Sequence, residues 1–176
     1  MPGGPGDVAG GRDEHLITQP HSLPGTADTR HHCGMGAGGW RWNDAWIFVS
    51  AVIAARLERD RALHAALPVT GASLADVLAA ADFLHHSVPS RAELEESVRR
   101  LAGADLITVD DDLVEVAPAG EQLWRSRPFS GLSSAVVTMQ TQLNRASRPG
   151  DDGWTLSEVT YQAAVREYAL RLADGR

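Results

Sequence analysis

Apolar residues recur at helical spacing in several separate stretches of this chain, and each stretch is bounded by residues that stop a helix. Between residues 43 and 60 the apolar positions cover most of the circumference, which predicts a central core helix capped by Asn43. A second helix is expected from Ser73 to about residue 86, because a capping-box pair opens it and Pro89 follows it. The first half of the folded sequence is therefore expected to be helical.

A third helix, over residues 90–102, runs directly into a predicted hairpin. One apolar stripe marks the helix, and β-branched runs at residues 106–109 and 113–116 mark the two strands. Pro118 closes the second strand and opens a further helix. The connection between the strands consists of three aspartates: Asp110, Asp111 and Asp112.

Two more helices are predicted in residues 128–176, each with one apolar stripe. The stripe of the first consists of Leu132, Val136, Met139 and Leu143, and that of the second of Tyr161, Val165, Tyr168 and Leu172. Both stripes exceed what the preceding unit needs, so they either cover its core or form a homodimer interface. We expect a homodimer, with the second stripe as its candidate interface.

Residues 1–39 are rich in Gly, Pro and His and lack a periodic apolar pattern, which predicts a disordered arm. The arm contains His21, His31, His32 and Cys33, but no scaffold that would fix a metal site is visible, and we expect none. The domain boundaries expected from composition are 1–39 for the arm, 40–127 for a compact unit and 128–176 for a helical extension.

Composition restricts the functions to be considered. The single cysteine excludes an intrachain disulfide, and the formal net charge of −7 opposes unspecific attraction to nucleic acid or anionic membrane. No secretion signal or membrane-spanning run is apparent, so we expect a cytoplasmic protein. No nucleophile elbow, phosphate loop or zinc-protease helix is present, so we expect neither an enzyme nor a bound cofactor.

The order of helix, helix, helix, acidic hairpin and proline-opened helix resembles winged helix-turn-helix proteins, in particular small bacterial transcription regulators of the MarR-like or PadR-like type. The resemblance covers residues 43–127. It implies a mainly α fold with a small β-hairpin wing and additional C-terminal helices. In such a fold the helix at residues 90–102 is the recognition helix, the aspartate turn is the wing, and the terminal helices form a homodimer.

The resemblance also implies which side chains face DNA, namely Ser90, Arg91, Arg99 and Arg100. Three glutamates share this helix, and two of them are expected to pair four residues onward, Glu95 with Arg99 and Glu96 with Arg100. Residues 40–127 carry nine arginines against fourteen acidic residues. Two functions therefore stay open: a DNA-binding transcription regulator, which we rank first, and an acidic winged-helix module that binds protein and not DNA.

Overall fold

The structure, a computed structural model, describes residues 38–129 and 131–174. These residues form six α-helices and a small three-stranded antiparallel sheet, so the predicted helix-rich fold with a hairpin is confirmed at that level. The predicted arm, apart from its last two residues, lies outside the described residues. So do its histidines and Cys33.

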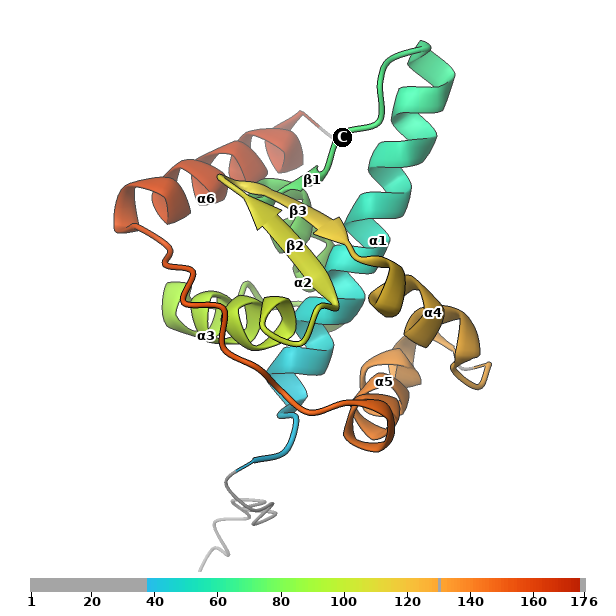
Figure 1. The fold of residues 1–176 in the computed structure, drawn as a ribbon. Coiled ribbons are helices and arrows are strands. Elements are labelled where there is room, and N and C mark those ends of the chain that lie inside the picture. Colours follow the sequence, from blue (N-terminus) through green and yellow to red (C-terminus); the bar gives the residue numbers. More distant parts are fainter. Residues whose placement is uncertain (1–37, 130, 175–176) are drawn as a thin grey trace, which may run out of the picture. The chain divides into compact units, whose positions relative to one another are not determined.

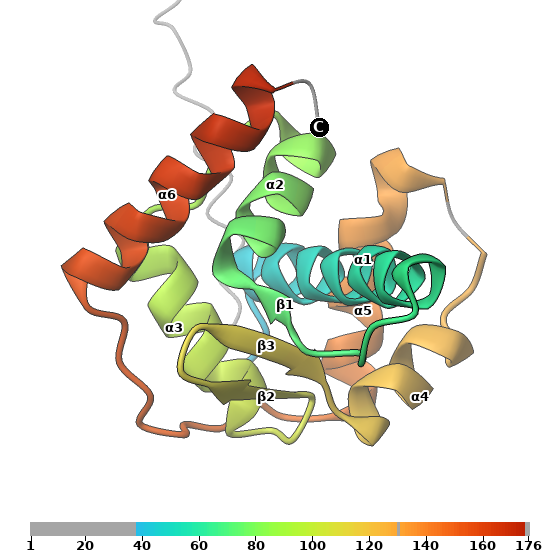
Figure 2. The ribbon, with the colours of Figure 1, turned by 90° about the horizontal axis from the view of Figure 1, so that it is seen from above.

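Helix α1, Trp42–Ala65, runs through the middle of the other elements, as Figures 1 and 2 show. It contacts α2, α3, α5, β1 and β3, and Phe48 and Val49 are fully buried. The prediction of a central core helix is therefore confirmed. The helix continues past residue 60 until Ala66, whose backbone adopts the left-handed conformation and ends it.

Helices α2, Leu74–His85, and α3, Arg91–Ala102, follow one another across a short turn. Ser73 and Asp76 form the predicted capping box of α2. The Trp46 indole N–H on α1 donates to the Ala81 carbonyl at 3.2 Å, which ties α1 to α2. The stripe of α3, made of Leu94, Val98 and Leu101, is buried as predicted.

The sheet has the order β1-β3-β2, with β1 at Ala72–Ser73, β2 at Ile107–Asp110 and β3 at Leu113–Val116. Asp110 is the last residue of β2 and pairs with Leu113, so the turn consists of Asp111 and Asp112 alone. The predicted three-residue turn was one residue too long. Asp111 has a φ of 52°, which suits a tight hairpin turn.

Three helices follow the sheet: α4, Pro118–Ser126, α5, Leu132–Ala146, and α6, Glu158–Ala173. Helix α5 packs on α1 and buries Met139 and Leu143, while α6 packs on α2. Both stripes of the C-terminal extension thus lie largely against the chain's own core. The sequence had left two possibilities open for these stripes, a dimer surface or a cover for the core, and the structure places them mostly on the core.

Candidate functional site

Ser90, which the resemblance places near DNA, holds the start of α3. Its hydroxyl donates to Glu93 Oε2 at 2.7 Å and accepts from the Glu93 backbone N–H at 3.4 Å. The Ser90 hydroxyl, and after it the Ser90 backbone N–H, stabilises the Glu93 carboxylate, so the pKa of Glu93 lies below its ordinary value. The hydroxyl is thus committed to the helix cap.

Arg91 links α3 to α6 and to the residues just before α6. One terminal nitrogen donates to Glu95 Oε2 at 2.6 Å and to the Leu156 carbonyl at 2.7 Å. The Arg91 Nε lies 3.3 Å from Glu158 Oε2. The guanidinium group is therefore surrounded by two carboxylates and a carbonyl of its own chain.

Arg99 and Arg100 are also occupied within the chain. Arg99 donates to both carboxylate oxygens of Asp151 at 2.7 Å, and this holds the pKa of Asp151 below its ordinary value. Arg100 donates to Asp44 Oδ2 at 3.0 Å and to the Gly39 carbonyl at 2.6 Å. Asp44 is 1% exposed, so Arg100 neutralises a buried carboxylate.

The ion pairs predicted along α3 were wrong. Glu95 pairs backward with Arg91, and Glu96 pairs with Arg41 at the start of α1. Arg99 and Arg100 reach acids that are distant in the sequence. Spacing along one helix offers several partners of equal reach, and the tertiary contacts select among them.

The segment between α5 and α6, residues 147–157, lies along α3, and we call it the strap. Figure 1 shows it running from α5 past α3 to the start of α6. The Gly150 N–H donates to the Arg100 carbonyl at 3.1 Å, and the Asp152 N–H donates to the Arg99 carbonyl at 3.2 Å. Leu156 is buried in the hydrophobic core. The strap is therefore held at the C-terminal end of α3 by these two bonds, and at the N-terminal end by the bond from Arg91 to the Leu156 carbonyl.

A cleft of about 760 Å³ lies between α3, the hairpin turn and the strap. Arg91 and Glu95 of α3 line it, together with Asp111 and Asp112 of the turn and strap residues such as Trp154. In the implied DNA-binding geometry this is the space between recognition helix and wing. Its charged lining contains three carboxylates and one guanidinium group, which favours a cation over a phosphate.

A second concave surface, which we call the groove, lies between α1, α2 and α6. It has a volume of about 780 Å³ and a mostly apolar lining, from Ile53 and Leu57 on α1 to Phe83 on α2 and Leu172 on α6. The apolar pattern did not predict it, because its walls come from three separate helices and α6 is far from α1 and α2 in the chain.

Asp76 lies at the floor of the groove between two arginines. Its Oδ1 accepts from Arg61 at 2.8 Å and from Arg171 at 2.7 Å, and its Oδ2 accepts from the Ser73 hydroxyl at 2.6 Å. Burial alone would raise the pKa of Asp76, but these three donors outweigh it and hold that pKa below its ordinary value. Glu58 also pairs with Arg61, and Glu167 also pairs with Arg171.

The four residues proposed for a dimer interface have different environments. Tyr168 is buried, and its hydroxyl donates to Asp82 at 2.8 Å. Burial first, and then this hydrogen bond, raises the pKa of Tyr168 to about 12. Tyr161 donates to the Pro89 carbonyl at 3.0 Å and packs with Val165 against the core, whereas Leu172 is exposed. Of the four, Leu172 is exposed, Tyr161 and Val165 are half-buried, and Tyr168 is buried.

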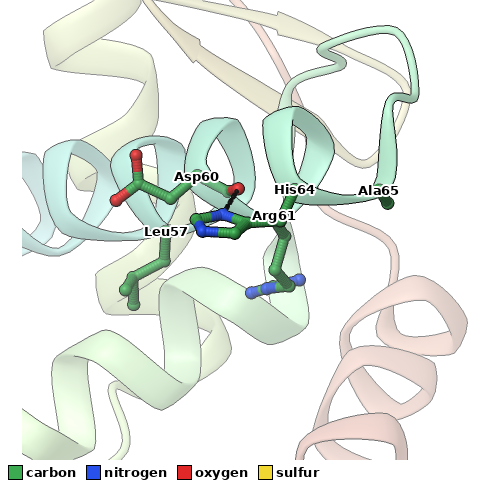
Figure 3. A pocket seen from close by; sticks show the side chains of 5 residues that line it. All are labelled: Leu57, Asp60, Arg61, His64 and Ala65. Carbon is green, nitrogen blue, oxygen red and sulfur yellow. Dashed lines mark hydrogen bonds between the residues drawn. The ribbon is translucent and has the colours of Figure 1, made fainter.

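A shallower hollow of about 490 Å³ lies near the end of α1. Figure 3 shows the side chains that line it. All of its lining residues belong to this one helix, and the His64 ring N–H donates to the Asp60 carbonyl at 2.7 Å. Leu57 and Arg61 point from here towards the neighbouring helices, where they also line the groove. With one wall, the hollow lacks the convergent polar groups of a binding site.

Within the described residues, no cluster of His, Cys, Asp or Glu has the composition to hold a metal ion. None of the helices described has the length and apolar character needed to cross a membrane. No protein family, no curated protein and no solved structure matches this chain.

Proposed function

We propose that this chain is a winged-helix protein-interaction module whose third helix does not read DNA. The winged-helix assignment is supported by the order α1, β1, α2, α3, β2, β3 and by the strand order β1-β3-β2. A hairpin that follows a helix-turn-helix pair is the arrangement that the sequence resemblance implied. The short strand β1, which precedes α2 and pairs with β3, was not part of that prediction. We also propose that the protein is cytoplasmic.

One observation carries the functional part of the proposal: the strap lies along α3, and acidic side chains of α1, α6 and the strap neutralise the arginines of that helix. Recognition helices enter the major groove and place side chains on base edges and phosphates. Here Arg91 and Arg99 bind carboxylates of α6 and the strap, and Arg100 binds Asp44. A phosphate would have to displace these acids and the strap backbone together.

The magnitude of this competition is set by the most buried pair. If Arg100 turned to a phosphate, the Asp44 carboxylate would stay buried without its cationic partner, at a cost on the order of 3 kcal/mol. That corresponds to a loss of more than about a hundredfold in affinity. The net charge of −7 would add repulsion at long range.

A DNA-binding transcription regulator is the second candidate function, favoured by the element order and the three arginines on one helix. It requires release of the strap, after which Arg91 and Arg99, whose side chains are already 39% and 38% exposed, would be free of the acids of the strap and α6. This candidate predicts that weakening the strap increases affinity for DNA.

Fluorescence anisotropy with a labelled random duplex at ~50 mM salt, where phosphate contacts are strongest, tests the choice. We expect no binding by the full chain, nor by Asp151→Asn, which frees Arg99. Binding that weakens steeply with salt and with Arg99→Gln, but not with Arg145→Gln on α5, would replace the proposal by the DNA regulator. Arg145→Gln removes the same charge from an exposed position on another helix.

A further inference from the structure

The groove between α1, α2 and α6 gathers large apolar side chains that are exposed to solvent. Leu57 is 53% exposed, Phe83 63% and Leu172 58%, and each comes from a different wall of the groove. Soluble proteins seldom expose such residues together unless the surface binds something. Between them the wall is formed by Ile53 and Ala79, so the surface is both concave and apolar.

Both arginines that line the groove are paired with carboxylates. Arg61 and Arg171 both donate to Asp76 at the floor. Glu58 pairs with Arg61 and Glu167 pairs with Arg171, and the Glu167 side chain is 52% exposed. The residues that line the groove include three acids, Asp76, Glu167 and Asp174, and two arginines, so the groove carries an excess of negative charge.

The shape and lining of the groove suit a helix. Three helices wall it, and a fourth helix with one apolar stripe can bury that stripe against Leu57, Phe83 and Leu172 while its polar face stays in water. Basic residues beside the stripe would meet Glu167, which lines the groove and has a side chain that is 52% exposed.

The chain's own segments are poor occupants because they are acidic. A second copy carries the same net charge of −7 and would bring one acidic groove against another. Residues 1–37 contain four acidic residues and two arginines, so they too are repelled. The charge of the groove thus favours a segment from another protein.

We propose that the groove is the docking site for a basic amphipathic helix of a partner protein. This inference rests on the proposed function, since it names the partner class of the protein-interaction module. It assigns Phe83 as the apolar anchor and Glu167 as the rim carboxylate that selects a basic partner.

A designed peptide tests the inference directly on the full chain. The probe is a fluorescein-labelled helix of about 18 residues, five turns, with Leu on one stripe and Lys elsewhere. Two control peptides share its length: one has the same composition in scrambled order, and the other has Glu in place of Lys. We expect the amphipathic Leu/Lys peptide to bind more tightly than either control.

Variants then locate the binding surface. Phe83→Ala should weaken binding by about tenfold or more, as for an apolar anchor, and Glu167→Gln should weaken it more at low salt than at high salt. Val137→Ala is the matched control, because Val137 is 58% exposed on α5, away from the groove. It should leave the affinity unchanged.

Four results would overturn the inference. The first is equal binding of the scrambled peptide, and the second is an equal effect of Phe83→Ala and Val137→Ala on peptide binding. The third is displacement of the probe by a synthetic peptide of residues 1–37. The fourth is a wild-type dimer in sedimentation that Phe83→Ala converts to a monomer. The third result would assign the groove to the chain's own N-terminal segment, and the fourth to a second copy. Duplex binding through α3 would instead overturn the proposed function, so the two failures are distinguishable.

Discussion

Replacing Gly103 by Ala is expected to destabilise the protein, although the local backbone accepts alanine. Gly103 ends α3 with φ −64° and ψ −11°, which is ordinary right-handed geometry. A Cβ built at this position would lie 2.2 Å from the backbone N of Asp151 and 2.7 Å from the carbonyl carbon of Gly150. The strap backbone therefore occupies the space that the methyl group requires, and it must move.

Two opposing effects determine the sign of the change. By restricting the unfolded chain, alanine stabilises the protein by about 0.4–1 kcal/mol when nothing opposes it. Displacing the strap breaks the hydrogen bonds from Gly150 to Arg100 and from Asp152 to Arg99, each worth about 0.5–1.5 kcal/mol. The loss outweighs the gain, and we expect a net destabilisation of about 1–2 kcal/mol.

Urea denaturation followed by tryptophan fluorescence measures this difference. Gly38→Ala is the matched control, because no atom lies within 4 Å of a Cβ at that position. Gly150→Ala meets the same contact from the strap side, 2.0 Å from the Gly103 carbonyl oxygen. Once one substitution has displaced the strap, the second breaks few further contacts. The double variant should therefore lose clearly less unfolding free energy than the sum of the losses in the two single variants.

A Gly103→Ala variant that is as stable as the wild type, or more stable, would refute the strap contact. In that case the methyl group would have met open space, and only the effect on the unfolded chain would remain. The proposal that α3 does not read DNA would lose its main support, because the same backbone hydrogen bonds hold the strap on Arg99 and Arg100.

Two further predictions concern titrating groups. Because Asp76 has a folded-state pKa below its unfolded value, its stabilisation is complete above pH ~4 and is lost as the pH falls through the folded-state pKa. Asp76→Asn should therefore lower the free energy of unfolding by about 1–3 kcal/mol near pH 7. Urea curves near pH 3 should show a smaller difference between the variant and the wild type. An equal difference at both pH values would contradict the charge network around Asp76. The chain has two tyrosines, so tyrosinate absorbance should show Tyr168 ionising at about 12 and Tyr161 also above its ordinary pKa. Tyr168→Phe should remove the higher step, whereas two tyrosines that ionise together near pH ~10 would contradict the buried hydrogen bond to Asp82.

Much of the helical framework was determined by the sequence alone, because the signals that specify it act over a few residues. The apolar circumference of residues 43–60 identified the central helix, and the stripe of Leu94, Val98 and Leu101 identified the buried face of α3. The predicted capping box at Ser73 connects residues three apart, so both partners lie within one turn of the chain. The structure shows a second capping box, between Ser90 and Glu93, that was not predicted. The two-residue strand β1 left no such signal, since alternation cannot be recognised over two positions.

The candidate sites were decided only by the tertiary structure, because their contacts join residues far apart in the chain. On a helix Glu95 lies within reach of both Arg91 and Arg99, and spacing alone favoured the second. The strap supplies Asp151 to Arg99, which leaves Glu95 to Arg91. Likewise, Asp76 is recognisable in the sequence as a capping residue, but its place between Arg61 and Arg171 depends on how α1 and α6 pack beside α2. Local spacing fixes which face of a helix is buried, whereas the partner of a charged side chain depends on which segment the packing of the whole chain brings beside it.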